Sequence, residues 1–172
     1  MASALMGDRQ AFGDLVCRYQ EQVVGVVFRM CGDVDLAEEA AQEAFLRAWQ
    51  RLHQYKPQFP FRSWIFSIAI HLALDALRRE PETMDVDALD LQSAHPGPEG
   101  ALESKQRAEE VRQAVLALPP ASRAVLVLRE YQGLSYGEIA EVLGIPAGTV
   151  MSRLNYARRH LRQALSEDLE VL

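Results

Sequence analysis

Apolar residues recur at three- and four-residue intervals through most of this chain, a spacing typical of amphipathic α-helices. The pattern predicts helices over residues 8–30, 36–52, 62–79, 103–118, 123–131, 135–143 and 146–165. The helical period is lost over residues 81–102, where three prolines, two glycines and five acidic residues predict a flexible linker. The sequence therefore predicts an all-α protein with two small helical domains, 1–80 and 103–172, joined by an acidic linker at 81–102.

The C-terminal part of the chain has the signals of a helix-turn-helix. Ser135, followed three residues later by Glu138, is typical of a capping box that starts a short helix. Gly144 ends that helix, because glycine enters the left-handed conformation without steric cost. Pro146 is tolerated only in the first turn of a helix, so the second helix is expected to begin near residues 146–148.

The second helix of this motif has a buried side and a polar, basic side. Its apolar positions leave one outer face, made of Thr149, Met151, Ser152, Asn155, Tyr156 and Arg159 and flanked by Arg153, Arg158 and Arg162. Such a helix can lie in the major groove of DNA as a recognition helix. An ordinary helical hairpin with a solvated basic face is the alternative.

The charge distribution changes this picture. The chain has 18 basic and 24 acidic side chains and a net charge of -6, which excludes a uniformly basic DNA-binding surface. Most of the acidity lies in and beside the predicted linker, whereas residues 145–165 contain four arginines and no acid. With four phosphate contacts, the logarithm of the DNA affinity would fall with the logarithm of the salt concentration at a slope of only about -3.6. This is weak for a protein acting alone. The sequence therefore predicts DNA binding that is assisted by another subunit.

The helix predicted over residues 36–52 carries a stripe opposite its apolar side. The stripe is acidic, with a leucine at one end, and consists of Asp35, Glu38, Glu39, Gln42, Glu43 and Leu46. A charged stripe is usually a solvated helix face. The alternative is a docking face for a basic partner.

The loop at residues 53–63 combines aromatic rings with cations, namely Tyr55, Phe59 and Phe61 beside Lys56 and Arg62. Rings can stack on unpaired bases while cations contact phosphates, which is how proteins bind single-stranded nucleic acid. The rings could equally pin the loop to the core. On the helix that follows, polar residues recur at every fourth position and must face water, the loop or a ligand: Ser63, Ser67, His71 and Asp75.

Several function classes have no support in the sequence. We find no glycine-rich phosphate loop, nucleophile elbow or catalytic constellation, so we expect neither an enzyme nor a bound cofactor. The histidines and cysteines lack the spacing of a metal site. No apolar run is long enough to insert into a membrane, and the N-terminal residues lack the order of a signal peptide, so a cytoplasmic protein is expected.

Three segments resemble those of the extracytoplasmic-function (ECF) sigma factors, the small promoter-recognition subunits of bacterial RNA polymerase. AEEAAQEAFLRAWQRL at 37–52 resembles the helix of that family that binds core polymerase, and FRSWIFSIAIHLALDALRR at 61–79 resembles its -10 promoter helix. LPPASRAVLVLREYQGLSYGEIAEVLGIPAGTVMSRLNYAR at 118–158 resembles its -35 domain. The three motifs in this order, with an acidic linker, are more specific than the helix-turn-helix alone.

The resemblance implies three binding surfaces. Core polymerase is expected at the acidic stripe, on Asp35, Glu38, Gln42, Glu43 and Leu46. The -10 element is expected at the loop and the helix after it, on Tyr55, Lys56, Phe59, Arg62, Ser67 and His71. The -35 element is expected on Thr149, Met151, Ser152, Arg153, Asn155, Tyr156 and Arg159.

The resemblance also implies core RNA polymerase, promoter DNA and an anti-sigma factor as partners. His71 stands where the family often has asparagine, and Met151 and Tyr156 stand where it usually has lysine or arginine. We expect the two lost cations at Met151 and Tyr156 to weaken phosphate or guanine contacts and to shift readout toward apolar and stacking contacts. At His71, the family's base choice at -10 does not carry over. A helix-turn-helix regulator that acts without polymerase and a purely protein-binding helical adaptor remain the alternatives.

Overall fold

The computed structural model describes residues 2–79 and 98–167, and every regular element within these ranges is helical. The elements are α1 (Ala2–Leu5), α2 (Arg9–Cys31), α3 (Val34–Gln50), η1 (Leu52–Gln54), α4 (Phe61–Arg79), α5 (Pro98–Leu116), α6 (Pro120–Leu126), η2 (Val127–Tyr131), α7 (Tyr136–Leu143) and α8 (Ala147–Glu167). No helix in these two ranges combines the length and apolar character needed to cross a membrane. The predicted all-α fold is confirmed.

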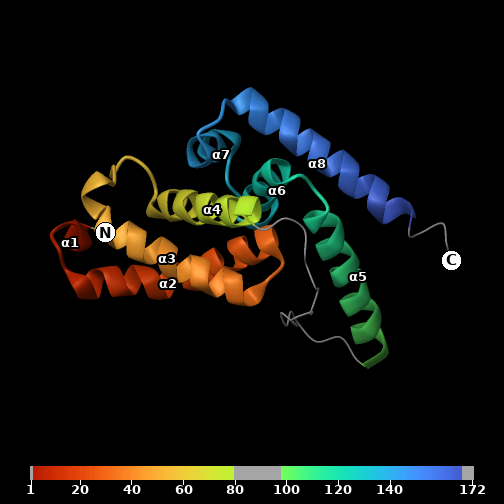
Figure 1. Cartoon of the computed structure of the whole chain (residues 1–172), viewed down its shortest axis with the longest axis horizontal. Helices are drawn as coiled ribbons and strands as arrows, with labels where there is room; N and C mark the ends of the chain where they lie inside the picture. Colours follow the sequence, from red (N-terminus) through yellow and green to blue (C-terminus); the bar gives the residue numbers. More distant parts are fainter. Residues whose placement is uncertain (1, 80–97, 168–172) are drawn as a thin grey trace.

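Helices α2, α3 and α4 pack against one another and form the N-terminal half of the molecule (Figure 1). The Asp8 carboxylate starts α2 by accepting hydrogen bonds from two backbone N–H groups of its first turn. Gly32 ends α2 with a φ of 78°, a left-handed conformation that favours glycine. Asp33 then caps α3 by accepting a hydrogen bond from the N–H of Leu36. With these caps in place, the turn between the two helices consists of only two residues, Gly32 and Asp33.

An aromatic cluster joins the first turns of α2 to the end of α3 and the start of α4. Its members are Phe12, Tyr19, Trp49, Tyr55, Phe61 and Trp64. Neighbouring ring centroids lie 5.0–6.3 Å apart in tilted or edge-to-face arrangements, which stabilise a pair by about 0.5–1.5 kcal/mol beyond area burial. The cluster fixes both ends of the loop that leads into α4.

Helices α5 to α8 form the C-terminal half, in which α7 and α8 are the predicted helix-turn-helix. The capping box of Ser135 and Glu138 is present in full, and Gly144 ends α7 with a φ of 63°. Helix α8 begins at Ala147, within the predicted range, and packs on α5, α6 and α7. The helix-turn-helix prediction is therefore confirmed in its caps, its turn and its boundaries.

Two boundaries differ from the sequence prediction. Helix α5 begins at Pro98, so its first turns occupy the last five residues of the predicted linker; proline at the start of a helix sacrifices no intrahelical hydrogen bond. The rest of the predicted linker lies outside the described residues. The helix predicted from Arg123 begins instead at Pro120 and changes to π-helical hydrogen bonding at Val127.

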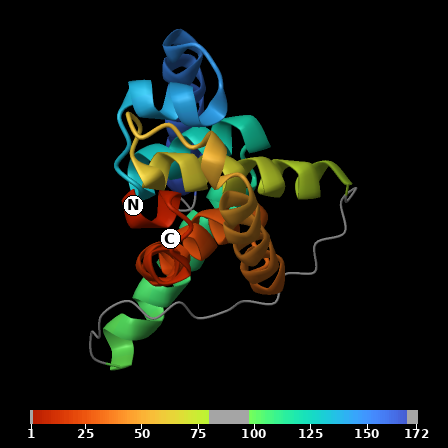
Figure 2. The ribbon, with the colours of Figure 1, turned by 90° about the vertical axis from the view of Figure 1, so that its left-hand side faces the viewer.

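The two halves are in direct contact and share one cluster of buried residues. Helix α4 packs against α6 and α7, while α2 contacts α5, α6 and η2. Both views place α7 alongside α4 (Figures 1 and 2). The sequence analysis predicted two linked domains and did not predict this contact.

Arg123 lies at the junction of the two halves and is 6% exposed. Its guanidinium donates to the carbonyl of Met30 in the last turn of α2, and also to the carbonyls of Leu116 and Leu118 at the end of α5. The last carbonyls of a helix have no intrahelical partner, and a cation suits the negative end of the helix dipole. A single arginine therefore caps two helices that belong to different halves.

Candidate polymerase and nucleic-acid interfaces

The outer side of α8 presents the residues predicted to contact the -35 element. Val150, Leu154 and Ala157 are buried on the opposite side of the helix. Met151 and Tyr156 are 50% and 39% exposed, which is unusual for side chains so large and apolar. The other predicted residues are exposed or half-buried: Thr149, Ser152, Arg153, Asn155 and Arg159. The structure thus brings all seven predicted residues to the part of α8 that the fold leaves uncovered.

The arginines of α8 are not equivalent. The Arg158 guanidinium forms a salt bridge of 2.7 Å with the carboxylate of Glu130 in η2, which raises the pKa of Arg158. Arg153, Arg159 and Arg162 form no salt bridge within the described residues. The sequence shows four arginines here, and the ion pair could not be predicted from it because Glu130 precedes Arg158 by 28 residues.

The exposed side of α8 also has an aromatic pair. The ring centroids of Tyr156 and His160 lie 6.0 Å apart with an interplanar angle of 35°. The hydroxyl of Ser152 donates to the carbonyl of Thr149. Met151 is exposed on the same helix. The expectation that Met151 and Tyr156 shift base readout toward apolar and stacking contacts stays a prediction.

Glu138 connects the helix-turn-helix to α4. Its carboxylate accepts hydrogen bonds of 2.8 Å from the backbone N–H and from the hydroxyl of Ser135. The guanidinium of Arg62 on α4 donates to it at 3.3 Å. The hydrogen bonds from Ser135, with a smaller contribution from Arg62, lower the pKa of Glu138 below its ordinary value of 4.5.

We expect Glu138 to make the protein less stable in acid. A carboxyl group with a lowered folded-state pKa contributes stability above its ordinary pKa, and this contribution is lost as pH falls through the folded-state value. Glu138→Gln keeps an acceptor for Ser135 and removes the titration. Urea denaturation between about pH 5.5 and about pH 3.5 should show a smaller stability loss in this variant, by less than about 1 kcal/mol because the site is partly exposed. Equal losses in both proteins would contradict the assignment.

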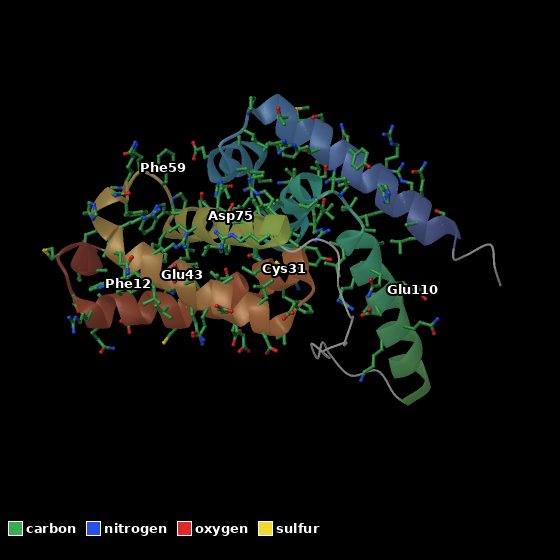
Figure 3. The ribbon with its side chains drawn as sticks, viewed as in Figure 1. Phe12, Cys31, Glu43, Phe59, Asp75 and Glu110 are labelled. Carbon is green, nitrogen blue, oxygen red and sulfur yellow. The ribbon has the colours of Figure 1, made fainter. Side chains whose placement is uncertain are left out.

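The acidic stripe on α3 faces outward. Asp35, Glu38 and Gln42 are exposed, and Leu46 is 57% exposed. Glu43, labelled in Figure 3, is half-buried and pairs with Arg47 one turn later, at 2.5 Å. The five predicted residues therefore share one side of α3, with the exposed leucine at the C-terminal end of the carboxylates.

An open groove of about 1100 Å³ runs beside this stripe, between α2 and α3. Its lining is mainly apolar and includes Phe12, Val16, Val24, Phe28, Phe45 and Trp49. Glu38, Gln42 and Leu46 also line it. The groove was not predicted from the sequence; Val16 and Val24 on its wall are only half-buried.

Most aromatic rings of the loop before α4 are buried in the core. Tyr55 and Phe61 are 8% and 6% exposed, and the Tyr55 hydroxyl donates to the carbonyl of Phe59. Burial raises the pKa of Tyr55. This favours the interpretation that Tyr55 and Phe61 pin the loop to the core. Phe59, half-buried at the outer edge of the loop (Figure 3), and the exposed Lys56 are the better placed for contact with DNA.

The polar stripe of α4 has three different environments. The Ser63 hydroxyl is buried and has no hydrogen-bond partner among the described residues. The Ser67 hydroxyl donates to the carbonyl of Val142 in α7 at 2.8 Å. His71 is exposed, with its Nδ1 atom 2.6 Å from the carbonyl of Ser67. The structure thus separates the predicted -10 residues, since Arg62 and Ser67 face α7 while His71 and Lys56 face solvent.

Comparison with known sequences identifies two family regions in the chain. Residues 2–82 match sigma-70 region 2, and residues 108–161 match sigma-70 region 4. The chain is 37% identical over 170 residues to the RNA polymerase sigma-H factor of Pseudomonas aeruginosa, covering 92% of this chain and 88% of that protein. It is 34% identical over 172 residues to the ECF RNA polymerase sigma factor SigW of Bacillus subtilis, covering 94% and 92%.

Two solved structures share the fold of this chain. CnrH, in a complex with the cytosolic domain of CnrY, matches with a TM-score of 0.75 and 26% identity over 97% of this chain and 95% of that chain. The sigma factor RpoE of Bartonella quintana, in a complex with the anti-sigma factor NepR, matches with a TM-score of 0.74 over 91% and 98%. Its identity of 18% supports the fold alone.

Proposed function

Since the chain belongs to the ECF sigma factors of the sigma-70 family, we propose that it binds core RNA polymerase and directs initiation at promoters with -10 and -35 elements. It acts as a non-catalytic initiation factor in the cytoplasm. Region 2, comprising α2 to α4, docks on polymerase and reads the -10 element. Region 4, comprising α5 to α8, reads the -35 element through α8.

The observation that carries this proposal is the presence of two different binding faces on one chain. The stripe on α3 is acidic and adjoins an apolar groove, which suits a protein partner with a basic, partly apolar surface. The outer side of α8 is basic and polar and belongs to a helix-turn-helix, which suits the major groove. Neither the DNA-only regulator nor the protein-only adaptor accounts for both faces.

The weak charge of α8 fits a reader that depends on polymerase. With Arg158 paired to Glu130, three arginines of α8 remain for phosphate or base contacts: Arg153, Arg159 and Arg162. With three phosphate contacts, the logarithm of the DNA affinity falls with the logarithm of the salt concentration at a slope of about -2.7. We propose that the affinity comes from docking of α3 on polymerase and that α8 supplies sequence selectivity.

An anti-sigma protein is the proposed regulator. CnrH, whose fold covers nearly all of this chain, was solved with the cytosolic domain of CnrY, and RpoE of B. quintana was solved with an anti-sigma factor. We propose a partner of the same class, which would compete with polymerase by covering the α2–α3 groove and the acidic stripe.

The proposed function is tested by run-off transcription with purified core polymerase and a genomic promoter library, with and without this chain. We expect a discrete set of transcripts that appears only when the chain is added. The control is the chain alone in a gel-shift assay on the same fragments at physiological salt. A shift by the chain alone, without any transcript that depends on it, would favour the polymerase-independent regulator.

Arg153 provides a test of the -35 surface. We expect Arg153→Ala to weaken binding of the holoenzyme to its promoter by about tenfold, because a base or phosphate contact of arginine contributes roughly 1–3 kcal/mol. The matched control is Arg107→Ala, which removes an exposed arginine of α5 outside the proposed DNA-binding surface and should leave promoter binding unchanged. Footprints and binding titrations measure both variants. An unchanged footprint for Arg153→Ala would leave Arg153 a structural role only.

A further inference from the structure

Arg158 lies in line with two of the proposed -35 residues, although it is not one of them. It follows Met151 by seven residues and Asn155 by three, spacings that place side chains on the same side of a helix. All three side chains are exposed. Arg158 is therefore on the side of α8 where an arginine could contact a DNA phosphate next to the -35 surface.

Glu130 holds this arginine from η2, the element before the helix-turn-helix. One carboxylate oxygen of Glu130 accepts from two nitrogens of the Arg158 guanidinium, from Nη2 at 2.7 Å and from Nε at 3.1 Å. The raised pKa of Arg158 comes mainly from this hydrogen bonding, with a smaller contribution from Tyr136 of α7. Side chains of two neighbouring elements thus hold the guanidinium before any DNA is present.

The ion pair is not needed to attach α8 to the fold. Val150, Leu154 and Ala157 are buried on the inner side of the helix, which packs on α5, α6 and α7. The side chains of Arg158 and Glu130 are 43% and 45% exposed, and ion pairs with such access to water contribute little to folding. The main effect of the pair is therefore on the charge that α8 presents to DNA.

A phosphate can bind Arg158 only by displacing Glu130, because both anions pair with the same guanidinium donors. A phosphate contact contributes about 0.9 to the salt slope, which is a factor of about eight in DNA affinity between about 1 M and about 0.1 M salt. Helix α8 has only three other arginines. Withholding one arginine therefore removes a large part of the sequence-independent affinity of this helix.

We propose that Glu130 withholds Arg158 from DNA and thereby determines how strongly DNA binding by this chain depends on polymerase. Phosphate contacts strengthen binding to all sequences alike. With Arg158 paired, the free chain binds unrelated DNA only weakly, whereas the holoenzyme gains its affinity from polymerase docking. This inference rests on the proposed function, because it takes α8 as the -35 reader and polymerase as the source of affinity.

The test is the binding of the full-length free chain to a labelled DNA duplex of unrelated sequence, measured by fluorescence anisotropy over a range of salt concentrations. Glu130→Gln keeps the size of the side chain and removes its charge. We expect this variant to bind about fivefold to tenfold more tightly than the unmodified chain at about 0.1 M salt. The slope of the logarithm of the affinity against the logarithm of the salt concentration should change from about -2.7 to about -3.6. Glu130→Ala should give the same slope.

The double variant with Arg158→Ala separates release of the arginine from simple loss of a negative charge. If Glu130 acts through Arg158, Glu130→Gln should change the DNA affinity by less than about twofold in the Arg158→Ala background. Glu109→Gln is the matched control, because it also removes one negative charge and releases an arginine, Arg112, but within α5. It should leave the salt slope unchanged, and urea denaturation verifies that each variant is folded.

Two results would overturn the inference: an unchanged salt slope for folded Glu130→Gln, or a gain in affinity of the same size with and without Arg158. Run-off transcription by the unmodified chain with core polymerase separates these results from failure of the proposed function. Transcripts that depend on the chain, together with an unchanged slope, would contradict only the role of Glu130. Absence of any such transcript would contradict the proposed function itself.

Discussion

Replacement of Leu46 by aspartate is expected to weaken binding to core polymerase by about tenfold to a hundredfold and to leave folding unchanged. Leu46 is 57% exposed at the rim of the α2–α3 groove, at the C-terminal end of the acidic stripe. Burial of a leucine side chain in an interface contributes about 1.5–3 kcal/mol, and a carboxylate in its place would have to be desolvated. The loss should therefore appear in affinity and in transcription together.

Met6→Asp is the matched control for Leu46→Asp. Met6 is 83% exposed in the same half of the molecule and does not line the groove, so the same change of chemistry is made off the proposed interface. Binding is measured by fluorescence anisotropy of the labelled chain with core polymerase, and stability by urea denaturation. Both variants should unfold within about 0.5 kcal/mol of the unmodified protein, as exposed substitutions usually do. Equal polymerase affinity for both variants would move the docking surface away from α3.

The parts of the fold that the sequence predicted well depend on short-range signals. Asp8, Gly32 and Asp33 set the ends of α2 and α3 through contacts within four residues, and the capping box of Ser135 and Glu138 starts α7 in the same way. These groups act on the backbone beside them. Their effect on the helix ends can therefore be predicted from the sequence without knowledge of the tertiary fold.

The candidate sites were predictable only in part, because their environment comes from distant residues. The sequence indicated that the polar stripe on α4 must face water, the loop or a ligand. In the structure, the Ser67 hydroxyl of this stripe donates to the carbonyl of Val142, 75 residues away. Glu130, 28 residues earlier in the chain, pairs with Arg158 and so removes it from the basic cluster on α8. The burial of Tyr55 likewise depends on the ring cluster that Phe61 and Trp64 of α4 form with Tyr19 of α2. No periodicity in the chain encodes these partners.

Arg123→Met is expected to destabilise the protein by about 2–4 kcal/mol, the largest effect on stability among the changes considered. Methionine fills a similar volume but leaves the carbonyls of Met30, Leu116 and Leu118 without the guanidinium. Each buried acceptor that loses its partner costs about 1–3 kcal/mol, partly offset because the arginine itself no longer has to be desolvated. Burial already lowers the pKa of Arg123, which is the sign of that desolvation.

Arg123→Lys and Arg112→Met separate the capping role from loss of charge or bulk. Lysine keeps the charge, but its single ammonium lacks the planar fork that reaches carbonyls of two helices, so it should recover less than half of the loss. Among the described residues, Arg112 pairs with Glu109 inside α5. Arg112→Met should therefore lower the free energy of unfolding by less than about 1 kcal/mol. Urea denaturation measures all three variants. Recovery of more than half of the loss by Arg123→Lys would assign the effect to charge and not to the planar guanidinium.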